Sequence, residues 1–173
     1  MVALVVEDAL LFVKRSHSMP SHKGQVALIG GHRSGDEKFP LETAMREFFE
    51  ETNLSLDHFE FITALPTVST SRDVSILPVL ALYHQDRNYL ETHLQTNGEW
   101  EVAFLVELSY LFNQEHWVEA NRISMSQRQN LLFCSLAEQD IKLLKGKPQY
   151  PLVLWGASAR VVDHLKNLIL TKS

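Results

Sequence analysis

The sequence is poor in cysteine, in positive charge and in long apolar segments. Its single cysteine, Cys134, excludes an intrachain disulfide and a metal centre built from several thiolates. Cys134 follows the apolar residues Leu131, Leu132 and Phe133. We therefore expect it to be buried and to behave as a small hydrophobe rather than as a reactive thiol.

Positive charge is scarce, because 16 Lys and Arg residues stand against 21 Asp and Glu residues, a net charge of -5. Proteins that coat nucleic acid usually present a basic face, so this balance argues against nucleic acid as a partner. A small anionic substrate is still compatible with the charge, since a bound cation reverses the local field.

The apolar segments are short. The first run, Val2–Val6, has no basic start and is too short for a signal peptide. The runs at 152–155 and 168–170 are far shorter than a membrane span. We expect a cytoplasmic protein that has no membrane partner.

The distribution of apolar residues predicts a single domain over 1–173 with an α+β fold, since we find neither repeats nor a linker. Apolar runs between turn residues predict strands at 2–6, 10–13, 25–29, 59–64, 74–83, 100–106 and 150–155. The interval 107–143 has a mixed pattern and predicts helical pieces and loops. An amphipathic helix is predicted after Gly156, with an apolar face formed by Val161, Val162, Leu165 and Leu168.

Residues 41–53 predict a helix with an apolar face and an acidic face. Apolar residues recur at helical spacing, at positions 41, 44, 45 and 48. Pro40 favours the start of the helix, and Asn53 can adopt the left-handed conformation that ends one. On the other side, Glu47, Glu50 and Glu51 converge, because residues three and four apart share a face.

The acidic face is costly without a counter-charge. The like-charged pair Glu47 and Glu51 costs about a few tenths of a kcal/mol. Glu50 and Glu51 in the last turn also oppose the helix dipole, at roughly 0.3–1 kcal/mol each. A solvated acidic surface is the plainer interpretation of such a helix. A hard divalent cation such as Mg²⁺ or Mn²⁺ would remove the repulsion, because it prefers oxygen ligands.

The same residues carry a family resemblance. The segment Arg46-Glu47-Phe48-Phe49-Glu50-Glu51-Thr52-Asn53-Leu54 resembles the second half of the Nudix box, Arg-Glu-apolar-x-Glu-Glu-x-Gly-apolar. Gly31 and Glu37 resemble the leading glycine and the first-half glutamate of that box, and Asn53 replaces its last glycine. The resemblance implies a Nudix-type α/β/α sandwich with a mixed central sheet.

A one-residue insertion narrows the resemblance. Eight residues separate Glu37 from Arg46, one more than in the plain box, which is similar to the coenzyme A pyrophosphatase branch. Further segments resemble that branch in the same order along the chain: Arg15–Ala27 leading to Gly30-Gly31, Leu65-Pro66-Thr67 followed by Ile76–Val79, and Trp155–Ala159. Departures from the branch pattern occur at Pro20, Leu28-Ile29, Ser34 and Asp73-Val74. The acidic helix is intact, whereas the substrate-facing signature has partly changed.

The resemblance implies metal-dependent hydrolysis of a diphosphate linkage. The substrate it implies is coenzyme A or acyl-coenzyme A, cleaved to adenosine 3',5'-bisphosphate and (acyl-)phosphopantetheine. The alternatives are another nucleoside diphosphate derivative (a nucleotide sugar, a dinucleotide or a nucleoside triphosphate) and a non-catalytic Nudix module that binds a ligand. The complete set of helix glutamates argues against the binding module. The sequence leaves open whether the chain is a monomer or a homodimer.

The resemblance also assigns catalytic roles to residues. Glu47, Glu50 and Glu51 would bind Mg²⁺ or Mn²⁺, and Arg46 would orient a carboxylate of the helix. Glu47, Glu99 or a water held by them would be the general base. Glu101 is the rival of Glu99, because both flank Trp100.

Other residues are expected to contact the substrate or to shape its site, namely Arg15, Gln25, Gly31 and Arg72, with Lys23 and Arg33 as further candidates for phosphate. Arginine suits phosphate because its planar guanidinium presents two donors side by side. Glu37 is expected to orient the loop or the helix rather than to bind metal. The histidines at 17, 22 and 32 are expected to have loop or hydrogen-bonding roles.

Overall fold

The structure, a computed structural model, describes residues 1–70, 74–123 and 128–171. Within these ranges the central sheet contains seven strands in the order β11-β8-β2-β1-β7-β4, with β3 paired to β2. β1 is antiparallel to β2 and parallel to β7, so the sheet is mixed. Its strands are β1 (Val2–Val6), β2 (Ala9–Arg15), β3 (Val26–Ala27), β4 (Phe59–Ala64), β7 (Val79–Tyr83), β8 (Trp100–Glu107) and β11 (Lys142–Lys145).

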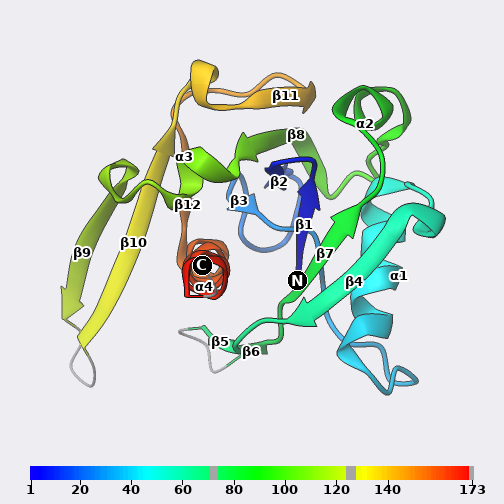
Figure 1. Cartoon of the computed structure of the whole chain (residues 1–173), viewed down its shortest axis with the longest axis horizontal. Helices are drawn as coiled ribbons and strands as arrows, with labels where there is room; N and C mark the ends of the chain where they lie inside the picture. Colours follow the sequence, from blue (N-terminus) through cyan, green and yellow to red (C-terminus); the bar gives the residue numbers. More distant parts are fainter. Residues whose placement is uncertain (71–73, 124–127, 172–173) are drawn as a thin grey trace.

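Two long helices lie on opposite sides of this sheet: α1 (Pro40–Thr52) and α4 (Gly156–Leu170) (Figure 1). The predicted α/β/α sandwich with a mixed sheet is therefore confirmed. Shorter helices are α2 (Arg87–His93) and α3 (Leu108–Phe112), and single 3-10 turns occur at Leu56–His58, Gln114–His116 and Glu138–Asp140. Over the described ranges, we find no helix with the length and apolar character needed to cross a bilayer.

The core is divided by the sheet into two clusters. Along β1, Val2, Leu4 and Val6 belong to the cluster on the α1 side, while the intervening Ala3 and Val5 belong to the α4 side. Successive side chains of a strand point to opposite faces, so a strand covered on both sides must be apolar throughout. This is why the run 2–6 is continuous rather than alternating.

The interval 107–143 was predicted to be helical pieces and loops, which is correct for α3 and two 3-10 turns but wrong for the strands that make up most of it. After α3 the chain forms a long antiparallel hairpin of β9 (Trp117–Ile123) and β10 (Arg128–Leu136). β10 also pairs with β12 (Leu152–Trp155), which makes a separate three-stranded sheet that packs against α4. Its strands are stabilised by a segment distant in sequence, which a local pattern does not reveal.

The predicted strand at 74–83 is interrupted. It forms β6 (Ser75–Ile76), which pairs with β5 (Val68–Ser69), and then β7, with Leu77 and Pro78 between them. Proline has no N–H to donate to a ladder, and the Pro78 carbonyl accepts from Leu65 N at 2.9 Å instead. The predicted strand at 25–29 is also shorter, since only Val26 and Ala27 belong to β3.

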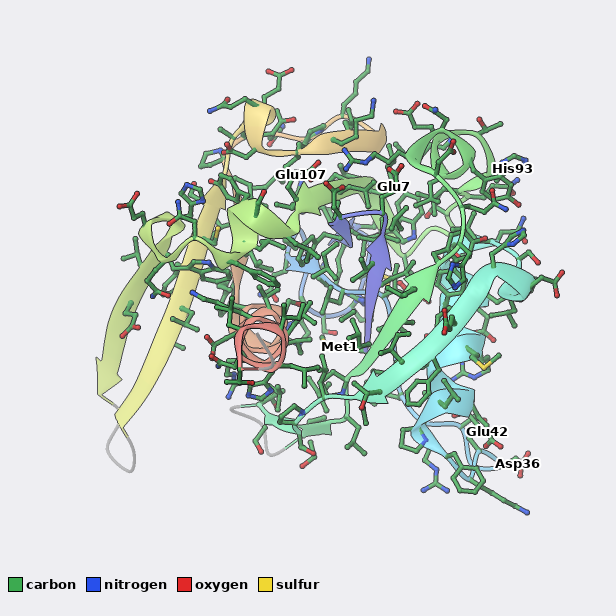
Figure 2. All side chains as sticks on the ribbon, viewed as in Figure 1. Met1, Glu7, Asp36, Glu42, His93 and Glu107 are labelled. Atoms are coloured by element: carbon green, nitrogen blue, oxygen red, sulfur yellow. The ribbon has the colours of Figure 1, made fainter. Side chains whose placement is uncertain are left out.

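An ion network anchors α2 to the sheet. The guanidinium of Arg87 contacts Glu7 and Glu107 at 2.8 Å each, and it also contacts Asp8. Glu7 and Glu107 lie together at one end of the sheet (Figure 2). One arginine at the first residue of α2 thereby ties that helix to the turn between β1 and β2 and to the end of β8.

The two adjacent phenylalanines of α1 provide a test of how the helix is anchored. Phe48 is fully buried against Phe59 and Tyr83, whereas Phe49 is 48% exposed. We expect Phe48→Ala to lower the free energy of unfolding by about 3–5 kcal/mol. Phe49→Ala should change it by no more than about 0.5 kcal/mol. Urea denaturation followed by circular dichroism measures both, and equal losses would show that the burial of α1 is assigned to the wrong side.

Candidate active site

Local contacts define both ends of α1. Phe39 is the N-cap, Pro40 occupies the first turn, and the Glu42 carboxylate accepts from the backbone N–H of Lys38 at 2.6 Å and of Phe39 at 3.2 Å. At the other end Asn53 adopts φ 54° and ψ 21°, and its N–H donates to the Phe49 carbonyl at 2.8 Å. The left-handed stop predicted at Asn53 is confirmed.

Glu51 is the buried carboxylate of this helix, with only 2% of its surface exposed. Its side chain accepts a hydrogen bond from the Gly30 N–H at 2.9 Å. Its backbone carbonyl accepts from the indole N–H of Trp100 at 2.8 Å. The last turn of α1 is therefore joined to the loop after β3 and to the start of β8 through a single residue.

Burial, together with the nearby carboxylates of Glu99 and Glu47, raises the pKa of Glu51 to about 7. The Gly30 N–H and the positive charge of Arg15 oppose this effect without cancelling it. A carboxyl buried beside two other carboxylates has a strong electrostatic preference for a cation. A divalent metal ion would therefore compensate the negative charges around Glu51 better than the protein does alone.

Arg46 connects the acidic side chains. Its Nε donates to Glu37 at 2.6 Å, its Nη1 contacts Glu50 at 2.8 Å, and its Nη2 contacts Glu47 at 2.8 Å. Nη2 also donates to the His32 carbonyl at 2.9 Å. The hydrogen bonds that Arg46 donates to the carboxylates, led by the one to Glu37, raise the pKa of Arg46, so the guanidinium stays charged. Arg46 thus orients Glu47 and Glu50, the kind of role that the resemblance implies.

Glu37 lies at the base of this network. One carboxylate oxygen receives Arg46, and the other accepts from Thr43 Oγ1 at 2.5 Å and from the Ser34 N–H at 2.8 Å. The hydrogen bonds from Arg46 and then Thr43 lower the pKa of Glu37 to about 2. Glu37 therefore joins the loop to the helix, in agreement with its expected orienting role.

Gly31 allows the loop to lie directly against the helix. A methyl group at Gly31 would overlap the Glu47 carboxylate, so a residue with a side chain requires one of the two to move. Gly30, one residue earlier, has φ 138° and donates its N–H to Glu51. The backbone of the glycine pair therefore lies against the side chains of both Glu47 and Glu51.

The structure separates Glu99 from its rival Glu101. Glu99 acts electrostatically on Glu51, and its carbonyl accepts from the Ser16 N–H at 2.8 Å. Glu101 instead contacts Lys14 at 2.6 Å, and the Lys14 ammonium lowers the pKa of that carboxyl. Of these two glutamates, Glu99 is the one whose charge acts on Glu51, while Glu101 stands where the pairing of β2 with β8 shifts register.

The segment from Arg15 to Gln25 forms a loop beside Glu51. Arg15 N donates to the Gln25 carbonyl at 2.9 Å, and Gly24 N donates to the Arg15 carbonyl at 3.1 Å. The Gln25 side chain is hydrogen bonded to His22 Nδ1 at 3.0 Å, which is a supporting contact for the loop. Arg15 Nε is buried without a hydrogen-bond partner among the described residues. It is therefore the arginine best placed to receive an anionic group.

The other basic candidates are not brought to the same place. Arg33 Nε donates to the Glu37 carbonyl at 2.6 Å and so belongs to the loop, while Lys23 is exposed. Arg72 lies outside the described residues. Of the expected arginines, Arg15 and Arg46 are the two that the structure places around the acidic helix.

The acidic side chains do not already form a cage, since we find no set of three metal-ligating groups around one point within 1–70, 74–123 and 128–171. The reason is visible in the contacts, because Arg46 holds Glu47 and Glu50 while Glu51 faces Gly30. Magnesium sites commonly use a few carboxylates and complete their shell with water and substrate phosphates. An open carboxylate set of this kind fits that donor chemistry.

Two residues that hold the site were not assigned roles from the sequence. Trp100 bonds the Glu51 carbonyl, and Thr43 bonds Glu37. Trp100 stands between two glutamates at the start of a predicted strand. This position could have predicted a buried residue that holds the site. Thr43 gave no such signal, since its contact depends on how the loop folds back on the helix.

Comparisons with known proteins agree on one family. The model of the NUDIX domain matches residues 1–129. The Uncharacterized Nudix hydrolase NudL of Yersinia enterocolitica is 22% identical over 163 residues, which cover 94% of this chain and 75% of that protein. The protein of the same name from Yersinia pestis strain Pestoides F is 23% identical over 163 residues, covering 94% of this chain and 73% of its own length.

A solved structure shows a partial likeness. The C. elegans Ap4A hydrolase binary complex has 21% sequence identity and a TM-score of 0.49, covering 62% of this chain and 80% of that one.

Gly31→Ala should reduce hydrolytic activity by at least about tenfold, because the added methyl displaces the Glu47 carboxylate from a geometry that catalysis needs. Gly35→Ala in the same loop is the matched control, since its added methyl meets nothing within 4 Å. Initial rates with Mg²⁺ measure both variants. Equal activity of the two would show that the contact between Gly31 and Glu47 is unimportant.

Glu51 should make the metal-free protein less stable as pH rises. Its pKa of about 7 in the folded state lies above the ordinary 4.5, so the folded chain holds the proton more tightly than the unfolded chain. The contribution of Glu51 to stability is therefore largest below pH 4.5 and is lost as pH rises through 7. Glu51→Gln stays neutral, and in EDTA it should exceed the wild type in urea midpoint at pH 8 but match it near pH 4.

The matched control for this titration is Glu101→Gln. Because Lys14 lowers the pKa of Glu101, that carboxylate stabilises the fold above its ordinary pKa and loses the effect as pH falls. Its variant should therefore be less stable than the wild type at pH 8, a change opposite in sign to that of Glu51→Gln. A Glu51→Gln difference that stays constant with pH would contradict the assignment.

Proposed function

Because this chain belongs to the Nudix family and is a pyrophosphohydrolase acting on a nucleoside diphosphate derivative, we propose that its substrate is coenzyme A or acyl-coenzyme A. The products would be adenosine 3',5'-bisphosphate and (acyl-)phosphopantetheine. The observation that carries metal-dependent cleavage at this site is the buried Glu51 carboxylate, which has Glu47 and Glu99 near it and a single backbone N–H as its direct donor.

Glu47, Glu50 and Glu51 would hold Mg²⁺ or Mn²⁺. Bound there, the cation would polarise the phosphoryl oxygens, acidify water and neutralise charge on the leaving phosphate. Glu47 and Glu50 are now held by Arg46, so binding would exchange the guanidinium for the cation at these carboxylates. Arg46 would keep its contact with Glu37, which is 2.6 Å long and independent of the other two.

The remaining residues would position the substrate and move the proton. Arg15, whose Nε has no partner among the described residues, would donate to a phosphate oxygen. Glu47 or Glu99, or a water between them, would accept the proton of the attacking water. Gly31 would keep the loop close to the helix, and Gln25 would hold the Arg15 loop through His22.

Coenzyme A is favoured by contacts of the segments that resemble the coenzyme A pyrophosphatase branch. Ser158 Oγ, in the segment Trp155–Ala159, accepts from the Leu28 N–H at 3.3 Å, directly before the glycine pair. The segments 65–67 and 76–79 are joined by the hydrogen bond from Leu65 N to the Pro78 carbonyl at 2.9 Å. The two parts of one resembling segment are thus in contact with each other, and Trp155–Ala159 contacts Leu28, in the stretch that leads to the glycine pair.

The paired glutamates around Trp100 test the catalytic assignment. Glu99→Gln should lower kcat by at least about 100-fold, the usual scale for losing a general base. Glu101→Gln should retain activity, because that carboxylate pairs with Lys14. Assays with Mg²⁺ at fixed pH compare the variants, and a loss in Glu101→Gln alone would reverse the assignment.

The metal site and the substrate are tested together. Glu50→Gln and Glu51→Gln should each abolish most Mg²⁺-dependent hydrolysis, and unchanged activity would remove these residues from the site.

Wild-type protein is then incubated with coenzyme A, a nucleotide sugar, a dinucleotide and a nucleoside triphosphate, and the products are identified by mass spectrometry. Phosphopantetheine from coenzyme A supports the proposal. Cleavage of the others without it would assign the site to another nucleoside diphosphate derivative, and binding without cleavage would indicate a ligand-binding module.

A further inference from the structure

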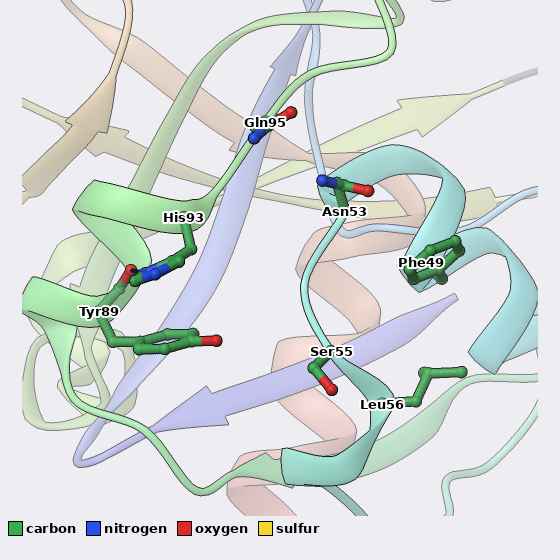
Figure 3. Close-up of a pocket in the computed structure, with 7 residues that line it drawn as sticks. All are labelled: Phe49, Asn53, Ser55, Leu56, Tyr89, His93 and Gln95. Atoms are coloured by element: carbon green, nitrogen blue, oxygen red, sulfur yellow. Dashed lines mark hydrogen bonds between the residues drawn. The ribbon is translucent and has the colours of Figure 1, made fainter.

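A cavity of about 480 Å³ lies beside the last turn of α1 (Figure 3). Phe49 and Asn53 of the helix form one wall, and Tyr89 and His93 of α2 form the facing wall. Sites for small molecules typically measure about 300–1,000 Å³ and combine apolar surface with a few polar groups. The cavity has this composition, and none of its side chains is used in the chemistry proposed above.

The walls present aromatic faces that are held in place. Tyr89 and His93 stack with their ring centroids 4.0 Å apart and their planes 16° apart. The Tyr89 carbonyl accepts a hydrogen bond from His93 Nδ1 at 2.9 Å, which restrains the histidine ring. On the other side Phe49 leaves 48% of its surface exposed. Rigid aromatic faces favour a planar ring over a flexible chain, because a planar ring has few rotatable bonds to immobilise when it stacks.

Polar groups complete the cavity. Asn53 and Gln95 carry side-chain amides that lie on the same side of the cavity, and the Tyr89 hydroxyl extends toward its interior (Figure 3). Across the described residues, none of these three groups has a hydrogen-bond partner. Each amide presents donors and an acceptor side by side, the pattern found along the edge of a heterocyclic base.

The cavity and the proposed metal site draw on neighbouring positions of the same helix. Asn53 follows Glu50 by three residues and Phe49 by four, and residues at these spacings lie about 5–6 Å apart at Cβ. Glu50 is itself half exposed, with 51% of its side-chain surface accessible. A phosphate at the glutamates and a ring in the cavity would therefore occupy neighbouring positions along α1.

A backbone contact links the same two places. Gln95 N donates to the Thr52 carbonyl at 2.9 Å, which fixes the start of the segment that ends at Glu99. This segment is ordered internally, since Thr96 Oγ1 bonds the Trp100 carbonyl and Asn97 accepts from the Glu99 N–H. The wall of the cavity and the candidate base are thus parts of one rigid connection.

We propose that this cavity binds the nucleobase of the substrate, stacked on Phe49 and facing the Tyr89 and His93 pair, with the amides of Asn53 and Gln95 at its edge. The inference rests on the proposed function, because it assigns the base and the diphosphate of one molecule to adjacent positions. Stacking of a base on an aromatic ring is sequence-tolerant, so the amides would supply the selectivity among bases.

Phe49→Ala is the first test, with coenzyme A and an analogue in which an abasic ribose replaces adenosine. The variant should raise KM for coenzyme A about tenfold, the scale of a lost base–aromatic contact, while leaving kcat unchanged. The abasic analogue should show the same KM with both proteins. Phe61→Ala on β4 is the matched control, since Phe61 is 41% exposed and lies outside the cavity.

Adenosine binding gives a readout that does not need catalysis. Saturation-transfer NMR should detect adenosine on the wild type and on Phe61→Ala, and lose the signal on Phe49→Ala. Adenosine should also inhibit hydrolysis competitively. Equal effects of Phe49→Ala on both substrates, no effect on either, or adenosine binding without competition would each overturn the inference. If the wild type cleaves no diphosphate, the proposed function fails, and the NMR comparison still tests the cavity.

Discussion

The last turn of α1 is held by one buried carboxylate, and much of the site depends on it. Glu51 receives the Gly30 N–H through its side chain and the Trp100 indole through its backbone, so helix, loop and strand meet at this residue. Burying a carboxylate here is unfavourable by itself, which is why the pKa of Glu51 rises to about 7. The helix is anchored beside this carboxylate by Ala44 and Phe48, which are buried in the core cluster on its side of the sheet, whereas Leu41 and Met45 of the predicted apolar face are half buried.

A second network arranges the charges around that residue. Arg46 holds Glu47 and Glu50, and Glu37 holds Arg46, so the helix carboxylates are oriented before any ligand arrives. Such preorganisation matters because groups that are already aligned need no rearrangement during the reaction. The guanidinium also supplies positive charge to carboxylates that would otherwise repel one another. A divalent cation could replace it at Glu47 and Glu50 while the contact with Glu37 persists.

The surface beside α1 relates catalysis to the recognition of the substrate. The carboxylates occupy one face of the helix, and Phe49 and Asn53 lie on the adjoining face beside α2. The position of α2 is itself set by Arg87, which contacts acidic residues at both the β1–β2 turn and the end of β8. Elements distant in sequence therefore form a single continuous surface along the helix.

The sequence by itself determined the acidic helix, its left-handed stop at Asn53 and the continuous apolar strand 2–6, because these depend on local spacing and conformational preference. It also placed Gly31 and Glu37 correctly relative to the helix, through the resemblance. Only the tertiary structure separated Glu99 from Glu101, since Glu101 is paired with Lys14 of the neighbouring strand while the charge of Glu99 acts on Glu51. Likewise the sheet of β9, β10 and β12 and the cavity at Phe49 depend on contacts between distant segments, and spacing along one segment carries no information about such contacts.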